Sequence, residues 1–329
     1  MTRLDTGSDA LITDASFIAS SSSGLSFSGA SFSGASFSGS GGFKEELAAF
    51  IAMQSVSGYA SHNAAVVRFL TTRLDALGFV VRIEGADESD QPLIIAKRAG
   101  SSSPALVLYN HYDVEAIGDD EQWLSDPFVL TQRDARLWAR GIADNKAVLL
   151  ARLAVIEARV QQGKPLPGMV WIIQGEEEVG SMLAHRFLPA ELDSVDAFIC
   201  LEETGYVREG VPLLFYRSSR TDNGEEHAHE PMLHSLNAAL FDGAGRFENR
   251  TMSKFGPCPL VSNLPGDALY IGFGPNDYQA RIHRDNESMS VDLLVQYHDV
   301  FDRFLGWVVD EIVAYVVDDV VDRAAGLSD

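Results

Sequence analysis

The sequence predicts an α/β protein with three layers, in which helices cover both faces of a central, mostly parallel, mixed sheet. From about residue 43 onward, short apolar runs alternate with longer amphipathic segments of helical period. Strands that alternate with helices are typical of a layered sheet covered on both faces. Ligands of such sheets bind beyond the carboxyl ends of the strands, so functional residues are expected there.

The composition favours a large folded unit with an acidic surface. The chain has 329 residues, 46% of them hydrophobic, and its 47 acidic and 25 basic residues give a net charge of −22. Such a chain can bury a sizeable core. Its charge repels nucleic acid and anionic membranes, because binding to phosphate needs clustered Lys and Arg. We therefore expect no nucleic acid and no membrane among its partners.

Three further features favour a cytoplasmic protein. No run approaches the roughly 18 apolar residues of a membrane span. The N-terminus lacks the basic start and apolar region of a signal peptide. The two cysteines, Cys200 and Cys258, lie far apart and outside any CxxC pattern. Two reduced thiols are therefore expected.

Residues 1–42 differ from the rest of the chain. They are rich in Ser and Gly, and units of five residues start at positions 10, 15, 20, 25, 30 and 35. This period resembles pentapeptide-repeat proteins, whose coils form a four-sided β-helix. Stacked repeats need several neighbours before they bury a stable core. We interpret residues 1–42 as a low-complexity leader, either disordered or a poorly packed stub, and residues 43–329 as the folded domain.

The elements of residues 43–329 follow in alternating order. The segment at 43–53 has helical spacing, and a second helix is expected between Ser61, as its N-cap, and Gly78, as its stop signal. Further helices are predicted at 144–164, near 182–188, at 229–241 and from about Val291 to Val317. Apolar runs predict strands at 79–83, 93–97, 105–110, 169–173, 197–201 and 268–273.

Side chains that can bind metals follow several of these strands. His111 and Asp113 follow the strand at 105–110, and carboxylates follow the next two strands at Glu176–Glu178 and Glu202–Glu203. Asp144 precedes a helix, and His283 lies in a later loop. Taken singly, each has an ordinary interpretation as a surface histidine, a helix N-terminal charge or a solvated loop acid. Together, several carboxylates at one end of a sheet would repel one another, and a pair of divalent cations would offset that repulsion. Imidazoles beside carboxylates suit zinc, cobalt or manganese.

Six motifs in a fixed order make the pattern specific. They are HYDV, W-x-x-DPF from Trp123, RGIADNK, GEEEVGS, EETG and IHRDNE. The chain strongly resembles the co-catalytic dizinc family that includes acetylornithine deacetylase, succinyl-diaminopimelate desuccinylase, carboxypeptidase G and carnosinase-type cytosolic dipeptidases. The resemblance covers about residues 43–329 and implies a zinc-peptidase catalytic domain.

The resemblance also implies a role for each residue of the site. One metal would be held by His111, Asp144 and Glu203, and the other by Asp144, Glu178 and His283, with Asp144 bridging the two. Asp113 would orient the His111 imidazole, and Glu177 would be the general base. Glu176 is an extra acid, expected to be solvated. The family's peptide bond after the bridging residue is cis, and Asn145 stands where the family often has Asp, a change expected to be mild.

The chain departs from the family in one large respect. The family inserts a second, pairing domain after the Glu203-type ligand, and here only a loop near 218–228 stands in its place. His227 or His229 is a candidate replacement for the histidine of that domain, although a surface residue before a helix is the simpler interpretation. Because the pairing domain is absent, we expect a monomer. Arg284, which could also pair with Glu287, and Asn286 are candidate substrate-binding residues.

These observations predict a hydrolase that contains two zinc ions, with cobalt or manganese as alternatives, and cleaves the amide bond of small peptides. Dipeptidase or carboxypeptidase activity fits the site. An N-acyl-amino-acid deacylase with the same mechanism is an alternative that the sequence leaves open. A catalytically silent metal-binding protein is the alternative from another class. The missing insert favours it, and the complete ligand set disfavours it.

Overall fold

The computed structural model describes residues 42–100, 105–218, 223–225, 227, 229–249 and 258–326. The leader predicted at 1–42 lies outside these residues, apart from Gly42. The helices are α2 (Phe43–Ala52), α3 (Ala60–Ala76), α4 (Ala147–Gln162), α5 (Met182–Asp193), α7 (Glu230–Phe241), α8 (Pro259–Ser262) and α9 (Val291–Gly326), with short turns η1 (Ile142–Lys146) and η2 (Glu177–Val179).

The strands predicted at 79–83, 93–97, 105–110, 169–173, 197–201 and 268–273 all occur, within one residue at each end. The strands are β1 (Val80–Glu84), β2 (Leu93–Arg98), β3 (Ala105–His111), β4 (Thr131–Arg133), β5 (Arg136–Trp138), β6 (Met169–Gln174), β7 (Ala197–Leu201), β8 (Val207–Arg208), β9 (Val211–Arg217), β10 (Arg246–Asn249), β11 (Leu269–Gly272) and β12 (Ser288–Ser290).

Within the described residues, nine strands form the main sheet. Their order is β1-β2-β6-β3-β7-β11-β9-β10, with β8 paired to β9. The four central strands β6, β3, β7 and β11 run parallel to one another, whereas β1, β2 and β9 each pair antiparallel with a neighbour. The predicted mixed sheet with a parallel centre is confirmed. Parallel strands end at the same edge, so the carboxyl ends of the central strands meet there.

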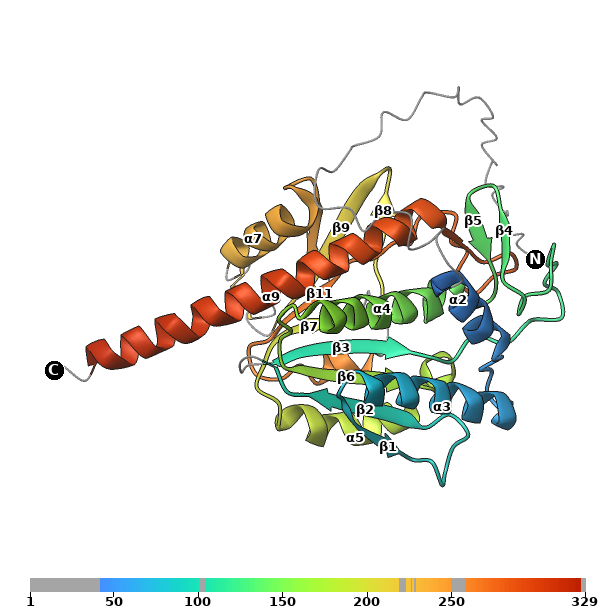
Figure 1. Cartoon of the computed structure of the whole chain (residues 1–329), viewed down its shortest axis with the longest axis horizontal. Helices are drawn as coiled ribbons and strands as arrows, with labels where there is room; N and C mark the ends of the chain where they lie inside the picture. The colour runs from blue at the N-terminus through green and yellow to red at the C-terminus, as the bar shows by residue number, and fades with distance from the viewer. Residues whose placement is uncertain are drawn as a thin grey trace, which may run out of the picture. The chain divides into compact units, whose positions relative to one another are not determined.

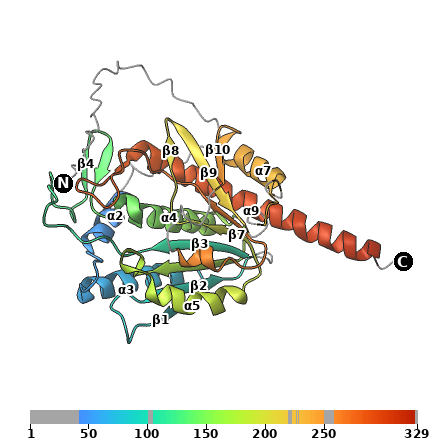
Figure 2. The ribbon, with the colours of Figure 1, turned by 180° about the vertical axis from the view of Figure 1, so that it is seen from behind.

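The two faces of the sheet are buried by different helices. Alternate strand residues such as Leu108 and Trp171 join one apolar cluster with α3, α4, α7 and α9. The intervening residues, such as Val107 and Ile172, join a second cluster with α5 and α8. Figure 1 shows α4 and α9 side by side on the first face, and Figure 2 shows α5 from the opposite side. These clusters form the predicted three layers, because each strand alternates its side chains between two apolar surfaces.

A small second sheet supports the loops at the carboxyl edge. Strands β12, β5 and β4 pair antiparallel in that order. Arg136 of β5 donates two hydrogen bonds to the Asp277 carboxylate, at 2.7 and 2.9 Å, and another to Ser288 Oγ. This sheet therefore ties the segment before η1 to the segment that follows His283.

Several predicted boundaries were wrong for identifiable reasons. Ser61 is not the N-cap of α3, which begins at Ala60 after Tyr59 without a side-chain cap. The helix predicted from residue 144 begins at Ala147, because Asp144 and Asn145 have non-helical backbone angles. The last helix continues to Gly326 rather than Val317. Gly78 does end α3, with the positive φ of 81° expected of such a residue.

Strand β9 was not predicted, although Val211–Arg217 is a seven-residue strand in the main sheet. Strands β10 and β12 and the β4–β5 hairpin were also missed, since each has only three or four residues. Runs this short give little periodicity.

Within the described residues, none of the helices has the length and apolar character needed to cross a bilayer.

The packing of α4 against the sheet predicts a large stability difference between two substitutions on this helix. Leu150 is fully buried, whereas Val160 is 39% exposed. Leu150→Ala should lower the free energy of unfolding by about 2–5 kcal/mol, because it leaves a cavity. Val160→Ala should lower it by less than about 1 kcal/mol. Urea unfolding followed by circular dichroism measures both, and equal effects would contradict the packing described.

Candidate metal centre

Five side chains converge at the carboxyl edge of the central strands. His111 is the last residue of β3, Glu178 lies in η2 after β6, and Glu203 follows β7. Asp144 lies in η1 before α4, and His283 lies in the loop between β11 and β12. The residues that the sequence predicted as metal ligands thus lie together, although they are spread over most of the folded region.

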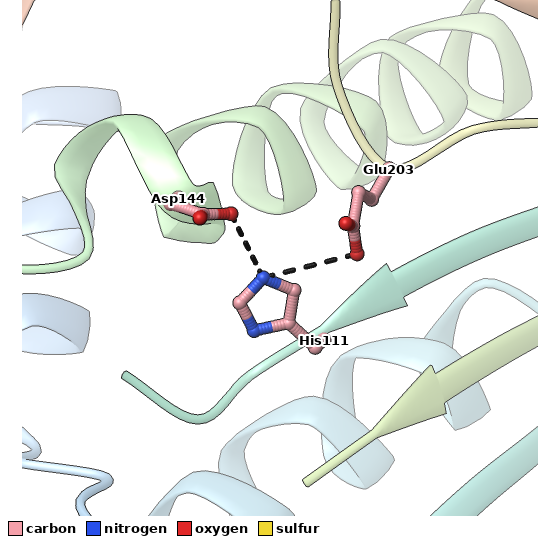
Figure 3. A group of neighbouring side chains, drawn as sticks. All are labelled: His111, Asp144 and Glu203. Atoms are coloured by element: carbon pink, nitrogen blue, oxygen red, sulfur yellow. Dashed lines mark hydrogen bonds and ion pairs between the residues drawn. The ribbon is translucent and has the colours of Figure 1, made fainter. Parts of the chain in front are cut away.

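The Asp144 carboxylate lies between two histidines. Its Oδ1 is 2.9 Å from His111 Nε2, and its Oδ2 is 3.2 Å from His283 Nε2. A second carboxylate faces each histidine: Glu203 Oε2 lies 3.8 Å from His111 Nε2, and Glu178 Oε2 lies 2.9 Å from His283 Nε2. Figure 3 shows the first of these groups, with the His111 ring facing both carboxylates. The result is two triads that share Asp144.

The ligand atoms of each triad are close enough to surround an ion. In the group His111, Asp144 and Glu203, and in the group Asp144, Glu178 and His283, these atoms lie within 4.8 Å of one another. Imidazole nitrogens with carboxylate oxygens are donors that zinc accepts at about 2.0–2.2 Å. The donor set therefore fits two divalent cations bridged by one carboxylate.

The backbone at Asp144 has a special conformation. Gly141 has a positive φ of 76°, and the peptide bond between Asp144 and Asn145 is cis, as expected. An alanine at position 141 would bring its Cβ within 2.4 Å of the Val114 side chain. Glycine is therefore required there, both for its positive φ and for the lack of space for a Cβ. Lys146 Nζ donates to the carbonyls of Phe50 and Met53 at the end of α2, and this fixes the far side of the turn.

Glu287 clamps this turn from the other side. Its buried carboxylate accepts hydrogen bonds from the backbone N–H groups of Gly141 and Ala143, at 3.0 and 2.8 Å, and from that of Asp144 at 3.2 Å. Arg140 donates to the same carboxylate at 3.2 Å. The sequence did not predict this role of Glu287, and its predicted pairing with Arg284 is wrong because Arg140 holds that place. Burial raises the pKa of Glu287 to about 7.

Asp113 links the two triads behind the ligands. Its Oδ1 lies 3.2 Å from His111 Nδ1, and its Oδ2 accepts a hydrogen bond of 2.9 Å from the Glu178 backbone N–H. A carboxylate on the second ring nitrogen fixes the tautomer and leaves Nε2 free to bind a metal. This position agrees with the orienting role expected from the sequence.

The three consecutive glutamates have different surroundings. Glu177 and Glu178 lie in η2, and Glu177 forms a further candidate group with His111 and Glu178. Burial raises the pKa of Glu177. The Glu176 carboxylate instead accepts a hydrogen bond of 3.1 Å from the Leu183 backbone N–H in the first turn of α5. Glu176 is also partly exposed, and its carboxylate satisfies a backbone donor that the first turn of α5 leaves without an intrahelical partner.

The predicted substrate-binding residues and the two candidate replacement histidines lie outside the two triads. Asn286 is engaged with the preceding loop, since its amide donates to the Gln122 carbonyl and accepts from the Leu124 N–H, both at 2.9 Å. Arg284 is exposed beside His283. His227 is exposed and lies 2.6 Å from Glu230, whereas His229 is buried against Ser218, so the interpretation of His229 as a surface residue is wrong.

The site charges favour cations in the positions between the carboxylates. Burial lowers the pKa of His111, but Glu203, Asp113 and Asp144 outweigh it and hold that pKa well above its usual value. Hydrogen bonds to Asp144 and Glu178 raise the pKa of His283 to about 10. Both shifts have the same cause, the carboxylates that surround each imidazole. Divalent cations bound there would meet the same negative charge and would compete with protons for the ring nitrogens.

The structure combines an α/β/α fold with two triads of candidate metal ligands that share one carboxylate. The family model described as "Peptidase family M20/M25/M40" matches residues 107–306. The chain belongs to this family.

Curated relatives match shorter stretches. The cysteinylglycine-S-conjugate dipeptidase of Corynebacterium striatum is 29% identical over 173 residues, which is 51% of this chain and 38% of that protein. The succinyl-diaminopimelate desuccinylase of Maricaulis maris is 32% identical over 116 residues, or 35% of this chain and 29% of that protein. This chain therefore covers well under half of either relative.

A solved structure shows the same fold over a longer stretch. The metallo-carboxypeptidase Sso-CP2 of Sulfolobus solfataricus has a TM-score of 0.58 and 15% identity. The likeness covers 80% of this chain and 98% of that chain. At this identity the likeness bears on the fold, and it agrees with the layered architecture described above.

The raised pKa of His283 predicts that zinc binding depends on pH. The folded-state pKa of about 10 lies above the ordinary value of 6.5, so the metal-free site is protonated at neutral pH. Zinc must displace that proton, and its affinity should rise as the pH increases toward about 10. Isothermal titration at pH 7 and 8.5, in buffers that differ in ionisation enthalpy, should show release of at least one proton.

His283→Asn should remove this part of the proton release and weaken zinc binding. His234→Gln is a matched control, because His234 is exposed on α7 and packs edge-on against Phe247. Zinc binding with no proton release in the wild-type protein would contradict the assignment of His283.

Proposed function

We propose that this protein is a dizinc hydrolase that cleaves the amide bond of small peptides, as a dipeptidase or carboxypeptidase. The observation that carries the proposal is the Asp144 carboxylate, whose two oxygens each face a different histidine and a different second carboxylate. Membership of a peptidase family supports the class of reaction. Cobalt or manganese would also suit these ligands.

The proposed site holds each ion with one histidine and two carboxylates. His111, Asp144 and Glu203 would bind one ion, and Asp144, Glu178 and His283 the other. When bound, zinc lowers the pKa of water from about 15.7 to about 7 and polarises the carbonyl group of the substrate. The exposed fraction of the His283 side chain, 48%, supports an opening on that side through which a substrate could reach the centre.

Glu177 is the proposed general base. It would take a proton from the attacking water and pass it to the nitrogen of the leaving amine. Burial raises its pKa, and His111 lowers it. A base works best when its pKa approaches the operating pH, so the raised value suits this role.

The substrate class rests on relatives that share only part of their length with this chain. One relative is named as a cysteinylglycine-S-conjugate dipeptidase and another as a desuccinylase of succinyl-diaminopimelate. The first name favours a small peptide as the substrate. The second supports the alternative, an N-acyl amino acid cleaved by the same mechanism.

We further propose that residues 43–329 form the catalytic domain and that a loop near 218–228 replaces the second domain of the family. Strand β9 ends at Arg217 and α7 begins at Glu230, so the connection is short. Much of that loop lies in the part of the chain that the structure does not describe. Without a pairing domain the protein should be a monomer, and light scattering of the purified protein measures this directly.

Glu177→Gln should lower kcat by about 10²–10⁴-fold while zinc binding is kept, because it removes the base and preserves the shape of the side chain. Glu176→Gln is the matched control, since the amide oxygen can still accept from the Leu183 N–H. This control should keep most of the activity. Hydrolysis is measured on dipeptides and N-acyl amino acids with zinc, cobalt or manganese added.

The same substrate panel decides between the proposals. Turnover of dipeptides alone supports the peptidase, and turnover of N-acyl amino acids alone supports the deacylase. No turnover by metal-loaded protein across the panel would favour a catalytically silent metal-binding protein. Unchanged kcat in Glu177→Gln would overturn the assignment of the base.

A further inference from the structure

A buried arginine in the middle of α4 connects the ends of two central strands. The Arg152 side chain is fully buried. Its Nη1 donates to the Tyr109 carbonyl at 2.9 Å and to Asn110 Oδ1 at 2.8 Å. Its Nη2 donates to the Glu202 carbonyl, and its Nε donates to the Tyr297 hydroxyl at 2.9 Å. Residues 110 and 202 directly precede the ligands His111 and Glu203, so one guanidinium holds both strand ends.

The orientation of the Asn110 amide follows from its donors. Asn110 Oδ1 accepts from Arg152 Nη1 and also from Trp171 Nε1, at 3.0 Å. Guanidinium and indole groups donate but cannot accept, so this atom must be the amide oxygen. The amide nitrogen then points the other way, 3.0 Å from Asn145 Oδ1 and 3.4 Å from the Glu203 carbonyl.

The orientation of Asn145 follows in turn. Because Asn110 presents its NH₂ group, the facing atom of Asn145 must be its oxygen. Asn145 Nδ2 is therefore directed at Glu203 Oε2, at 3.3 Å. The same Glu203 oxygen lies 3.8 Å from His111 Nε2. A row of hydrogen bonds thus runs in one direction from Arg152 through Asn110 and Asn145 to the Glu203 carboxylate.

We propose that Arg152 is a positioning residue for the metal ligand Glu203, which it orients through Asn110 and Asn145. The inference rests on the proposed dizinc site. An N–H group that faces the Glu203 oxygen stabilises the ionised carboxylate in its binding orientation, whereas an amide oxygen in that place would repel it. Such supporting hydrogen bonds set the affinity of a metal site.

The row also gives Asn145 a role that the sequence did not reveal. Asn145 stands where the family often has Asp, a change expected to be mild. An ionised Asp only accepts hydrogen bonds, so it could take the Asn110 N–H but could not donate to Glu203. In this chain the Asn145 amide therefore supplies the donor that faces Glu203.

Asn110→Asp tests the direction of the row. The new carboxylate has the same shape and can still accept from Arg152 and Trp171, but it presents an acceptor to Asn145. The Asn145 amide should then turn its NH₂ group toward position 110 and its oxygen toward Glu203. We expect zinc at one of the two sites to bind on the order of 10–100-fold more weakly, with the other site unchanged.

Arg152→Met removes the first donor of the row of hydrogen bonds, and Arg159→Met is its matched control. Arg159 is a second buried arginine of α4, but it donates to Asp302 and to the Pro165 carbonyl instead. Arg152→Met should weaken the same zinc site as Asn110→Asp. Arg152→Lys, which keeps a charged donor, should recover part of that loss. Arg159→Met should lower only stability and should leave both zinc affinities unchanged.

Zinc titration by calorimetry and the visible spectrum of the cobalt-loaded protein give readouts independent of turnover. If the double variant Asn110→Asp/Arg152→Met loses no more affinity than the weaker-binding single variant, the two residues act through one row. Wild-type affinity at both sites in a folded Asn110→Asp protein would overturn the proposal, even if Arg152→Met fails to fold. Wild-type protein that binds no zinc would instead overturn the dizinc site itself.

Discussion

The centre of this molecule depends on one carboxylate shared by two histidines. Asp144 lies between His111 and His283, and each histidine faces a further carboxylate from a different strand end. Carboxylates this close repel one another unless positive charge lies between them. These carboxylates raise the pKa of both imidazoles, and the donor set suits divalent cations in the same places.

The rest of the fold holds Asp144 in position. The parallel centre of the sheet brings the ends of β3, β6 and β7 to one edge, and helix α4 starts directly after the turn that carries Asp144. Glu287 binds three backbone N–H groups of that turn, and Lys146 ties its other side to the end of α2. Buried polar groups are costly unless they are hydrogen-bonded, so this network fixes one arrangement of the site.

The sequence predicted the layers, the central strands and the convergence of five side chains at one sheet edge. These features follow from apolar periodicity and from the rule that parallel strands end together. It did not predict β9 within the main sheet, nor the contacts of Glu287 and Arg152. Glu287 meets Gly141 across 146 positions and Arg152 meets Tyr297 across 145, and no local pattern records such a pairing. Local apolar periodicity can be recognised in a sequence, whereas the partners of buried polar groups depend on the assembled fold.

The measurement that tests the central claim most directly is X-ray absorption at the zinc edge of the zinc-loaded protein, with zinc content determined on the same sample. Two metals bridged by a carboxylate lie about 3.5–4 Å apart. The account predicts close to two zinc ions per chain and scattering from a second metal at about that distance. A single equivalent of zinc with no metal–metal scattering would contradict it.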